Sequence, residues 1–367
     1  MSSPEVHQLF YGQPITTHAF NKDRTQVALS PNNHEVQIWS KTGSGWTLSH
    51  TLAEHDKLVT SIDWAPNTNR IVSCSQDRNA YVWSWDGKEW KPTLVLLRIN
   101  RAATFVRWSP AENKFAVASG ARLIAVCYFE EDNNWWVSKH IKKPIRSTVL
   151  SLDWHPDNIL LVAGSTDMKA RVFSAWIKGV DAKASNPVWG EKLPFATLCG
   201  EFGSETGGWI HSVAFAPSGN AIAFASHDST LTIATGPSNP IQTIPTFTLP
   251  LVSIIFASEN SIIGVGHDCV PYLFALRGAQ WELVDKIDKG QKKELAANTA
   301  FRKFQQMDSR AQAQGDVELN STHQNTITSV RAHDGSAQNV SKFSTTGIDG
   351  KLVIWDLLSS GVANLRL

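Results

Sequence analysis

The most informative feature of this 367-residue chain is a local pattern that occurs seven times. In each copy a turn residue, most often Asp, precedes an aromatic or apolar strand residue by six positions. The pairs are Asn33 and Trp39, Asp77 and Trp83, Ala121 and Cys127, Asp167 and Phe173, Asp228 and Ala234, Asp268 and Phe274, and Asp349 and Trp355. A repeated unit buries its apolar face against the next copy. The chain is therefore predicted to be a seven-unit repeat protein, an architecture that mostly binds other proteins.

Each unit reads as a set of short antiparallel strands. An aromatic residue lies 12 or 13 positions before the turn residue in six copies, as Trp64 does before Asp77. Proline often follows that aromatic, as in Trp64-Ala65-Pro66, and ends the strand because it has no N–H to donate. The turn residue itself fixes a hairpin, and an alternating strand such as 351–355 follows it. Four strands in about 40–45 residues are the blade of a β-propeller.

Seven blades predict one all-β domain over residues 1–367, a seven-bladed β-propeller, and not several domains. The last unit ends soon after Trp355. Its outermost strand is therefore predicted to come from the N-terminus, at about residues 6–11. A ring closed in this way leaves only short, protected edges.

Composition limits the compartment and the partners. The cysteines stand at 74, 127, 199 and 269 with no C-x-x-C pair, which predicts free thiols in a reducing compartment and neither disulfides nor a zinc site. The sequence shows no signal-like segment and no run of 18 apolar residues, so a cytosolic chain without membrane insertion is expected. A net charge of +1 disfavours nucleic acid as the main partner.

Three His-Asp pairs look like catalytic or metal-binding pairs. The acids of His227-Asp228 and His267-Asp268 are the turn residues of units 5 and 6, and His333-Asp334 is expected in a loop of unit 7. Neither a P-loop, nor a nucleophile elbow, nor an H-E-x-x-H motif occurs. No catalytic, cofactor-binding or metal residue is predicted, and the chain is not expected to be an enzyme. An enzyme that uses the central channel remains the minor alternative.

Two intervals break the repeat. Successive turn residues are 44, 44, 46, 61, 40 and 81 positions apart, so about 15 extra residues separate units 4 and 5 and about 40 separate units 6 and 7. Long loops in compact folds are usually functional or disordered. The first insertion, at about 176–208, is expected to be an ordered loop over a blade edge, and whether it contacts a partner stays open.

The second insertion, at about 286–320, is expected to carry a protruding amphipathic helix at about 295–311. Apolar residues recur there every three or four positions, which marks one face of a helix: Ala297, Ala300, Phe301, Phe304, Met307 and Ala311. Residues 286–311 have a net charge of +4 (7 − 3). This helix either packs on its own ring or docks in a groove of another protein. Polar flanks on both sides favour docking.

The units resemble those of the WD-repeat family, and Trp355-Asp356 is its eponymous dipeptide. The resemblance implies buried hydrogen-bond networks of His, Asp and Trp in two units. The residues are His55, Asp77 and Trp83 in unit 2, and His323, Asp349 and Trp355 in unit 7.

Longer stretches narrow the resemblance. They are 21–26, 31–36, 77–83, 97–103, 135–137, 139–148, 226–230 and 266–269. Together they resemble WD-repeat subunit 1 (p41-Arc type) of the actin-related protein 2/3 complex over essentially the whole chain. Residues 303–308 are similar to an Arg-Phe-x-x-Leu-Asp helix of that family, with Lys303 and Met307 in place of Arg and Leu.

This resemblance implies a non-catalytic scaffold and actin-binding subunit of a seven-protein assembly that nucleates branched actin filaments. The insertion helix would dock on the mother filament through Phe301, Arg302, Phe304 and Met307. The propeller would contact actin-related proteins and the other subunits, in the cytoplasm and the actin cytoskeleton. It would also help to bind the acidic tails of nucleation-promoting factors, through Arg98, Arg101, Lys142, Lys143 and Arg146. A solvated, generally basic face is the alternative for these five cations. ATP would belong to the actin-related partners, so no cofactor is expected here.

A different cytosolic WD-repeat adaptor, such as a substrate receptor of a ubiquitin ligase, is the alternative function. Such receptors often carry Asp-x-Arg just after the blade Trp. Here Trp83 is followed by Ser-Trp-Asp and Trp355 by Asp-Leu-Leu, which counts against that function.

Overall fold

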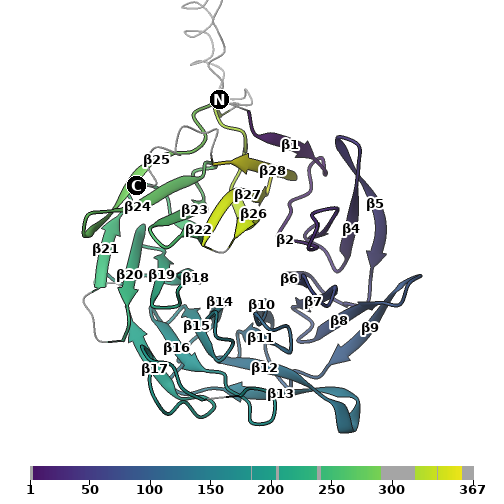
Figure 1. Cartoon of the computed structure of the whole chain (residues 1–367). Coiled ribbons are helices and arrows are strands. Elements are labelled where there is room, and N and C mark those ends of the chain that lie inside the picture. The colour runs from purple at the N-terminus through teal and green to yellow at the C-terminus, as the bar shows by residue number, and fades with distance from the viewer. Residues whose placement is uncertain are drawn as a thin grey trace, which may run out of the picture.

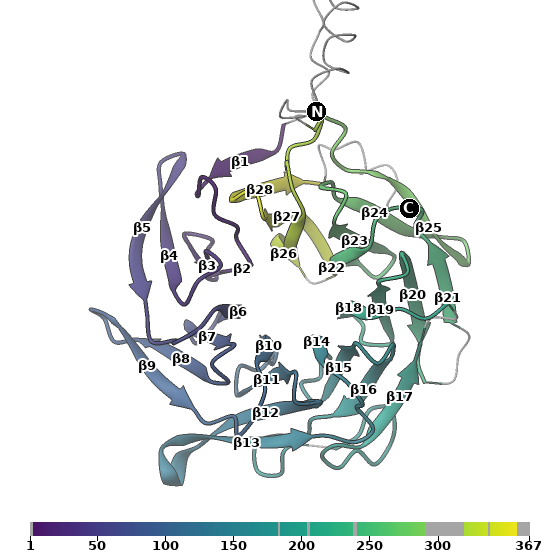
Figure 2. The same ribbon diagram turned by 180° about the vertical axis from the view of Figure 1, so that it is seen from behind.

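The computed structural model describes residues 3–182, 184–203, 206–237, 241–290, 319–336 and 338–357. In this part of the chain the strands form seven antiparallel four-stranded blades arranged radially around one axis (Figures 1 and 2). Five blades are separate sheets, while blades 6 and 7 are joined by a bridge between Ser258 and Asn339. The predicted seven-bladed propeller is confirmed.

The first four blades each use four consecutive strands. Blade 1 contains β2 (Thr17–Phe20), β3 (Gln26–Ser30), β4 (Val36–Thr42) and β5 (Gly45–Leu52). Blade 2 contains β6 (Val59–Ala65), β7 (Arg70–Ser75), β8 (Ala80–Trp85) and β9 (Trp90–Val95). Blade 3 contains β10 (Ala103–Trp108), β11 (Lys114–Ser119), β12 (Leu123–Glu130) and β13 (Trp135–Ile141), with a 3-10 turn at Glu131–Asn133. Blade 4 contains β14 (Val149–Trp154), β15 (Leu160–Ser165), β16 (Ala170–Ser174) and β17 (Leu198–Phe202).

The last three blades complete the ring. Blade 5 contains β18 (Ile210–Phe215), β19 (Ala221–Ser226), β20 (Thr230–Thr235) and β21 (Ile241–Pro245). Blade 6 contains β22 (Leu251–Ser258), β23 (Ser261–Gly266), β24 (Tyr272–Arg277) and β25 (Gln280–Lys286). Blade 7 contains β26 (Ile327–Ser336), β27 (Asn339–Gly347), β28 (Lys351–Asp356) and, as its outermost strand, β1 (Glu5–Gln8).

The ring closes by pairing the two ends of the described chain. β1 runs antiparallel to β28, from Glu5 opposite Ile354 to Gln8 opposite Lys351. The strand is shorter than the 6–11 expected from the sequence, because the backbone N–H groups of Leu9 and Phe10 both turn to the carbonyl of Gly350. Blade 7 therefore holds the N-terminal segment by a sheet ladder.

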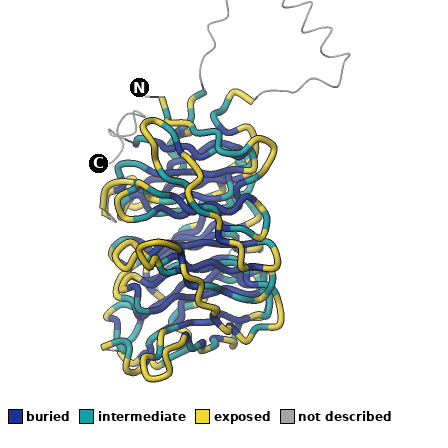
Figure 3. The backbone as a smooth tube through the Cα atoms, turned by 90° about the vertical axis from the view of Figure 1, so that its right-hand side faces the viewer, coloured by how far each residue is buried: buried dark blue, intermediate teal, exposed yellow. Residues whose placement is uncertain are grey.

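Burial follows the position of a strand within its blade. The second strands of blades 3, 4 and 6 are buried at every residue, because neighbouring blades cover both of their faces. The outermost strands are more exposed to solvent, as β5 is. Figure 3 shows buried strands inside the ring and exposed turns on its two flat faces. Apolar strand runs such as Phe115–Ala118 are thus the contacts between blades.

The pair His333-Asp334 lies in a strand, so its prediction as loop was wrong. β26 continues to Ser336 and pairs with β27 as a long hairpin. Its register shifts around Asp334, and such bulges let a strand continue through a polar Asp-Gly sequence that otherwise indicates a turn.

The four cysteines are free thiols. Cys74 in β7 and Cys127 in β12 are fully buried, and burial raises the pKa of both thiols, that of Cys74 to about 12. They act as small apolar residues of the core. Among the described residues no helix has the length and apolar character needed to span a membrane.

The insertion between β16 and β17 is packed on the ring. Trp189 and Leu193 are buried, and the Trp189 indole donates to the carbonyl of Gly219 in blade 5 at 2.8 Å. Lys114 of blade 3 forms a buried ion pair with Asp181 of the insertion. The insertion is therefore held against blades 3 and 5.

Ion pairs join the innermost strands of several blades. Arg331 of blade 7 reaches past blade 1 to blade 2, where it bonds the Asp63 carboxylate at 3.0 Å and the Ile62 carbonyl at 2.9 Å. Arg107 and Asp153 lie 3.8 Å apart on blades 3 and 4. Burial lowers the pKa of Arg331 to about 10, which still leaves it charged at neutral pH. The innermost strands are thus linked by ion pairs as well as by packing.

The seam between blades 7 and 1 is closed around one buried histidine. His18 of β2 is fully buried. Its Nε2 lies 2.8 Å from Ser344 Oγ, and its Nδ1 lies 3.0 Å from Thr346 Oγ1, both on β27. The His18 imidazole is neutral here, because burial and the charge of Arg331 hold the pKa of His18 well below its ordinary value.

Mild acid is expected to weaken this seam. Burial also lowers the pKa of His333, which packs on Phe20, to about 4. The unfolded chain binds protons at these histidines below about pH 6.5, whereas the folded chain does not. Their contribution to stability is therefore complete above that pH and is lost as the pH falls. We expect the unfolding free energy to drop by up to ~1.4 kcal/mol per pH unit for each histidine, measured by denaturant titrations between pH 7 and pH 5. His18→Gln should flatten this slope, and an equal slope in the variant would contradict the assignment.

Candidate partner-binding site: a basic surface on blades 3 and 4

Loops that join successive blades lie on one flat face of the ring. The connections 96–102 and 142–148 link an outermost strand to the next innermost strand. They emerge beside the turns between second and third strands, because Gly120 N donates to Ala102 O and Arg146 N donates to Asp167 Oδ2. We call this side the turn face. It carries the cations that the sequence singled out.

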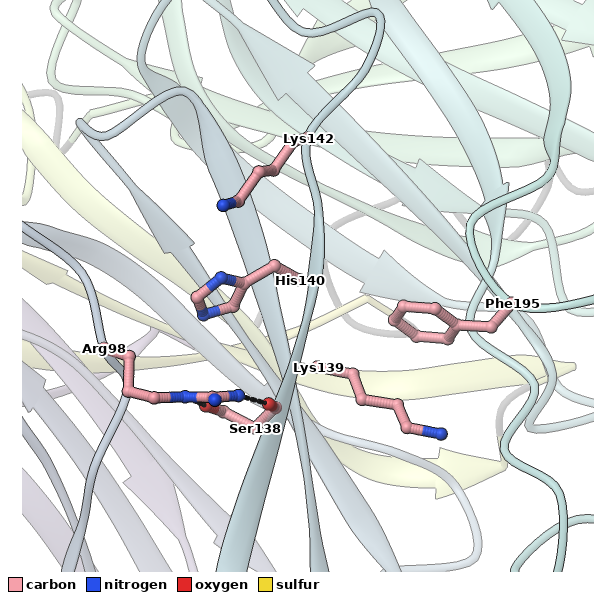
Figure 4. A pocket seen from close by; sticks show the side chains of 6 residues that line it. All are labelled: Arg98, Ser138, Lys139, His140, Lys142 and Phe195. Atoms are coloured by element: carbon pink, nitrogen blue, oxygen red, sulfur yellow. Dashed lines mark hydrogen bonds between the residues drawn. The ribbon is translucent and has the colours of Figure 1, made fainter.

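A pocket of about 570 Å³ opens where these connections meet β13. Its lining residues are Arg98, Ser138, Lys139, His140, Lys142 and Phe195. Figure 4 shows Arg98, His140 and Lys142 on one side of the β13 backbone, and Lys139 and Phe195 on the other. The pocket therefore has a cation on each side of an outermost strand.

Arg98 is fixed against the strand edge. Its backbone adopts the left-handed region (φ 53°), and its guanidinium donates to the carbonyl of Ser138 and, at 3.4 Å, to Ser138 Oγ. The Ser138 hydroxyl in turn donates to Leu96 O at 3.1 Å. A guanidinium has five N–H donors in a planar fork, so donors remain for an anionic ligand.

His140 lines the pocket but adds no positive charge to it. Its Nε2 donates to the carbonyl of Leu97 at 2.8 Å. Burial lowers the pKa of His140, and the charges of Lys142 and Arg98 lower it further against the opposing effect of that hydrogen bond. The imidazole is therefore neutral near pH 7, and the positive charge of the pocket comes from its Arg and Lys residues.

The insertion between blades 4 and 5 builds one wall. Its Phe195 ring lies 5.8 Å from Lys139 Nζ, which also lies 5.7 Å from the Tyr128 ring. Aromatic faces attract a cation at this range, so Lys139 is held between two rings. No sequence pattern selects Phe195, because its role depends on how the insertion packs.

The structure brings only two of the five predicted cations into the pocket, Arg98 and Lys142. Arg101, Lys143 and Arg146 are exposed on the same connections but do not line it. Within the described ranges no carboxylate lies within ion-pair distance of any of the five. The nearby Asp167 is instead paired with Arg171 at 2.8 Å. We call these five cations, with Lys139, the basic surface; none of the six has an ion-pair partner in the part of the chain that the structure describes.

The predicted His, Asp and Trp residues of unit 2 meet in one buried network. His55 Nδ1 lies 2.7 Å from Asp77 Oδ2, and His55 Nε2 lies 2.9 Å from Ser73 Oγ. The Trp83 indole also donates to Ser73 Oγ at 2.9 Å. Burial raises the pKa of Asp77, but hydrogen bonds from His55 and from the Asn79 backbone outweigh it and leave the pKa below its ordinary value. This carboxylate is a structural anchor of the turn.

Unit 7 repeats the arrangement. His323 Nδ1 lies 3.0 Å from Asp349 Oδ1, and Thr345 Oγ1 accepts the Trp355 indole N–H at 2.8 Å and contacts His323 Nε2. The hydroxyl at the centre was missed from the sequence. Its signal is spacing, because Ser73 and Thr345 both lie four residues before the acid.

The insertion helix predicted at 295–311, with Phe301, Arg302, Phe304 and Met307, lies outside the described residues. The described flanks show where the insertion is attached. Asp288 Oδ2 accepts the N–H of Thr322 at 2.6 Å, and Gly290 (φ 66°) lies so close to Asn320 that a Cβ would come within 2.6 Å of its carbonyl oxygen. The insertion therefore leaves and re-enters the turn face at adjacent points. Among the described residues no cluster of His, Cys, Asp or Glu could hold a metal ion.

Comparison with known proteins agrees with this architecture. The family model "WD domain, G-beta repeat" matches residues 46–84, 137–174 and 196–233. The chain is 55% identical over 368 residues to actin-related protein 2/3 complex subunit 1A-B of Xenopus laevis, covering 99% of each. It is 50% identical to subunit 1B-A of the same organism, covering 99% of this chain and 100% of the relative. It is 47% identical to subunit 1 of Schizosaccharomyces pombe, covering 94% of this chain and 97% of the relative. The chain belongs to the family of actin-related protein 2/3 complex subunit 1.

Proposed function

We propose that this protein is a non-catalytic scaffold subunit of an actin-related protein 2/3 complex, active in the cytoplasm at the actin cytoskeleton. The observation that carries the proposal is full-length similarity to relatives that are each named as subunit 1 of that complex. The WD-repeat ring supports it, because such folds mostly present surfaces to other proteins.

The insertion between blades 6 and 7 is proposed to dock on the mother filament, which the complex would branch. Two observations support this proposal. The sequence around Phe301 and Phe304 is apolar and basic, and contacts at Asp288 and Asn320 hold the two flanks of the insertion close together. Burying Phe301, Phe304 and Met307 in a groove of the filament would stabilise the bound state by roughly 5–8 kcal/mol before costs are subtracted. Ordering a short helix costs much of that free energy. The insertion would therefore bind weakly alone and act through the effective concentration that the rest of the complex provides.

The basic surface is proposed to receive the acidic tail of a nucleation-promoting factor. The support is the pocket between Arg98 and Lys139 and the absence of compensating carboxylates among the described neighbours. Carboxylates from a tail would find guanidinium and ammonium donors already in place.

Charge reversal of this surface is expected to weaken tail binding. Lys142→Glu with Lys143→Glu should reduce affinity for an acidic tail peptide by about 10- to 100-fold at low ionic strength, because two favourable exposed charges become repulsive. Fluorescence anisotropy with the peptide measures this. Lys22→Glu with Lys88→Glu, in exposed turns on the opposite face, makes the same change in net charge and is the matched control. Equal losses in both variants would point to net charge alone and against this site.

Co-purification tests the proposed function directly. The tagged full-length chain, recovered from cells, should bring down two actin-related proteins and the small companion subunits at equal stoichiometry, identified by mass. Recovery of a ubiquitin-ligase scaffold instead would contradict the proposal.

A further inference from the structure

Among the described residues, each blade ends in an outermost strand that has no further strand paired to its outer edge. Such edges bind other strands, and proteins protect them with charged residues or proline. Six of the seven outermost strands carry this protection. The protecting residues are Glu5 in β1, Lys91 and Pro92 in β9, Lys139 in β13, Glu201 in β17, Pro245 in β21, and Glu282, Asp285 and Lys286 in β25.

β5 is the exception among these outermost strands. Its eight residues, Gly45–Leu52, include no proline and no charged residue when histidine is neutral. Thr47, Leu48, Ser49 and Thr51 are exposed. In the part of the chain that the structure describes, no side chain or loop bonds to the outer backbone groups of β5, whereas Arg98 covers the Ser138 carbonyl of β13. The edge of blade 1 is therefore open.

Apolar side chains lie on both faces of this edge. Leu48 is opposite Trp39 and His50 is opposite Ile38, with a register shift between them, and these two partners pack in different core clusters. Leu48 is 48% exposed. On the other face the His50 ring lies 5.2 Å from the Trp85 ring, which is 39% exposed. An added strand would find an apolar contact above and below it.

We propose that β5 is extended by an uncharged, extended segment of another subunit, which adds a fifth strand to blade 1. The unpaired main chain selects an extended segment, because only a strand matches a row of alternating donors and acceptors. The lack of charge in β5 selects an uncharged segment, since a charged one would be desolvated against Leu48 and Trp85 without a partner. The identity of the occupant as a subunit rests on the proposed function.

A strand added to β5 would leave the basic surface and the insertion free to bind other partners. β5 lies on the circumference of the ring (Figure 1), while the basic surface and the base of the insertion lie on the turn face. One molecule can therefore use all three at once.

Hydrogen exchange of the full chain, free and in the purified complex, tests the inference. The outward amides within 46–51 should exchange rapidly in the free chain and slow by at least about tenfold in the complex. Leu48→Lys with Thr51→Glu places charges on two exposed positions, so the free variant should keep its melting temperature and lose this protection in the complex. Thr93→Glu with Leu94→Lys in β9, also exposed, is the matched control and should keep it.

Results against the β5 inference can be told apart from results against the proposed function. Equal exchange of β5 in the free chain and in the complex would overturn the inference while leaving the proposed function intact. Protection that survives in the β5 variant would assign it to another contact. A free chain that is dimeric by light scattering, and monomeric in the β5 variant, would make a second copy the occupant. Failure to recover the complex at all would instead count against the proposed function.

Discussion

Arg331→Met is expected to lower the free energy of unfolding by about 3–5 kcal/mol. The substitution removes the cation that bridges blade 7 to blade 2 and leaves the Asp63 carboxylate, whose side chain is only 12% exposed, without its ion-pair partner. A buried charge that loses its partner keeps its desolvation cost. Guanidinium denaturation at neutral pH, with refolding checked, measures the loss.

A double-mutant cycle separates this pair from simple side-chain loss. Asp63→Asn keeps an oxygen that can accept the Trp108 backbone N–H, which bonds Asp63 Oδ2 at 2.8 Å, but removes the charge. Arg331→Met with Asp63→Asn should therefore be more stable than Arg331→Met alone, because no unpaired buried charge remains. A loss below about 1 kcal/mol in the single variant, or strict additivity of the two changes, would show that the pair does not hold the ring.

The architecture followed from local sequence because its signals are local. A turn residue such as Asp77 fixes its hairpin through bonds to the next few residues, including its carboxylate with Asn79 N. Repeating that signal seven times determines the number of blades, and the short seventh unit requires a strand from elsewhere. The structure supplies that strand as β1. Each step depends on short-range geometry that sequence spacing records.

The contacts that the sequence did not reveal are long-range. Arg331 and Asp63 are separated by 268 positions. Phe195 reaches Lys139 because the insertion packs on the ring through contacts such as the Lys114–Asp181 ion pair and the Trp189–Gly219 hydrogen bond. No periodicity reports a contact whose partners meet only after the ring has closed.

The candidate site also combines residues that could be selected from the sequence with contacts that depend on the fold. Resemblance selected five cations, and the fold places all five on exposed connections of one face. Only Arg98 and Lys142 line the pocket, because β13 passes beside those two side chains. The open edge of β5 could not be predicted from the sequence, because the fold decides which strand of each blade is outermost.

Docking of the insertion on the mother filament is tested most directly by Phe301→Ala with Phe304→Ala in the purified complex. We expect intact assembly and an unchanged propeller, with affinity for filaments reduced by at least about tenfold because two aromatic anchors are lost. Branch density in a filament-imaging assay should fall with it, while Gln305→Ala with Gln306→Ala, on polar positions of the same segment, should leave it near wild type. Branch density of the Phe double variant equal to wild type would contradict the claim that this insertion docks on the mother filament.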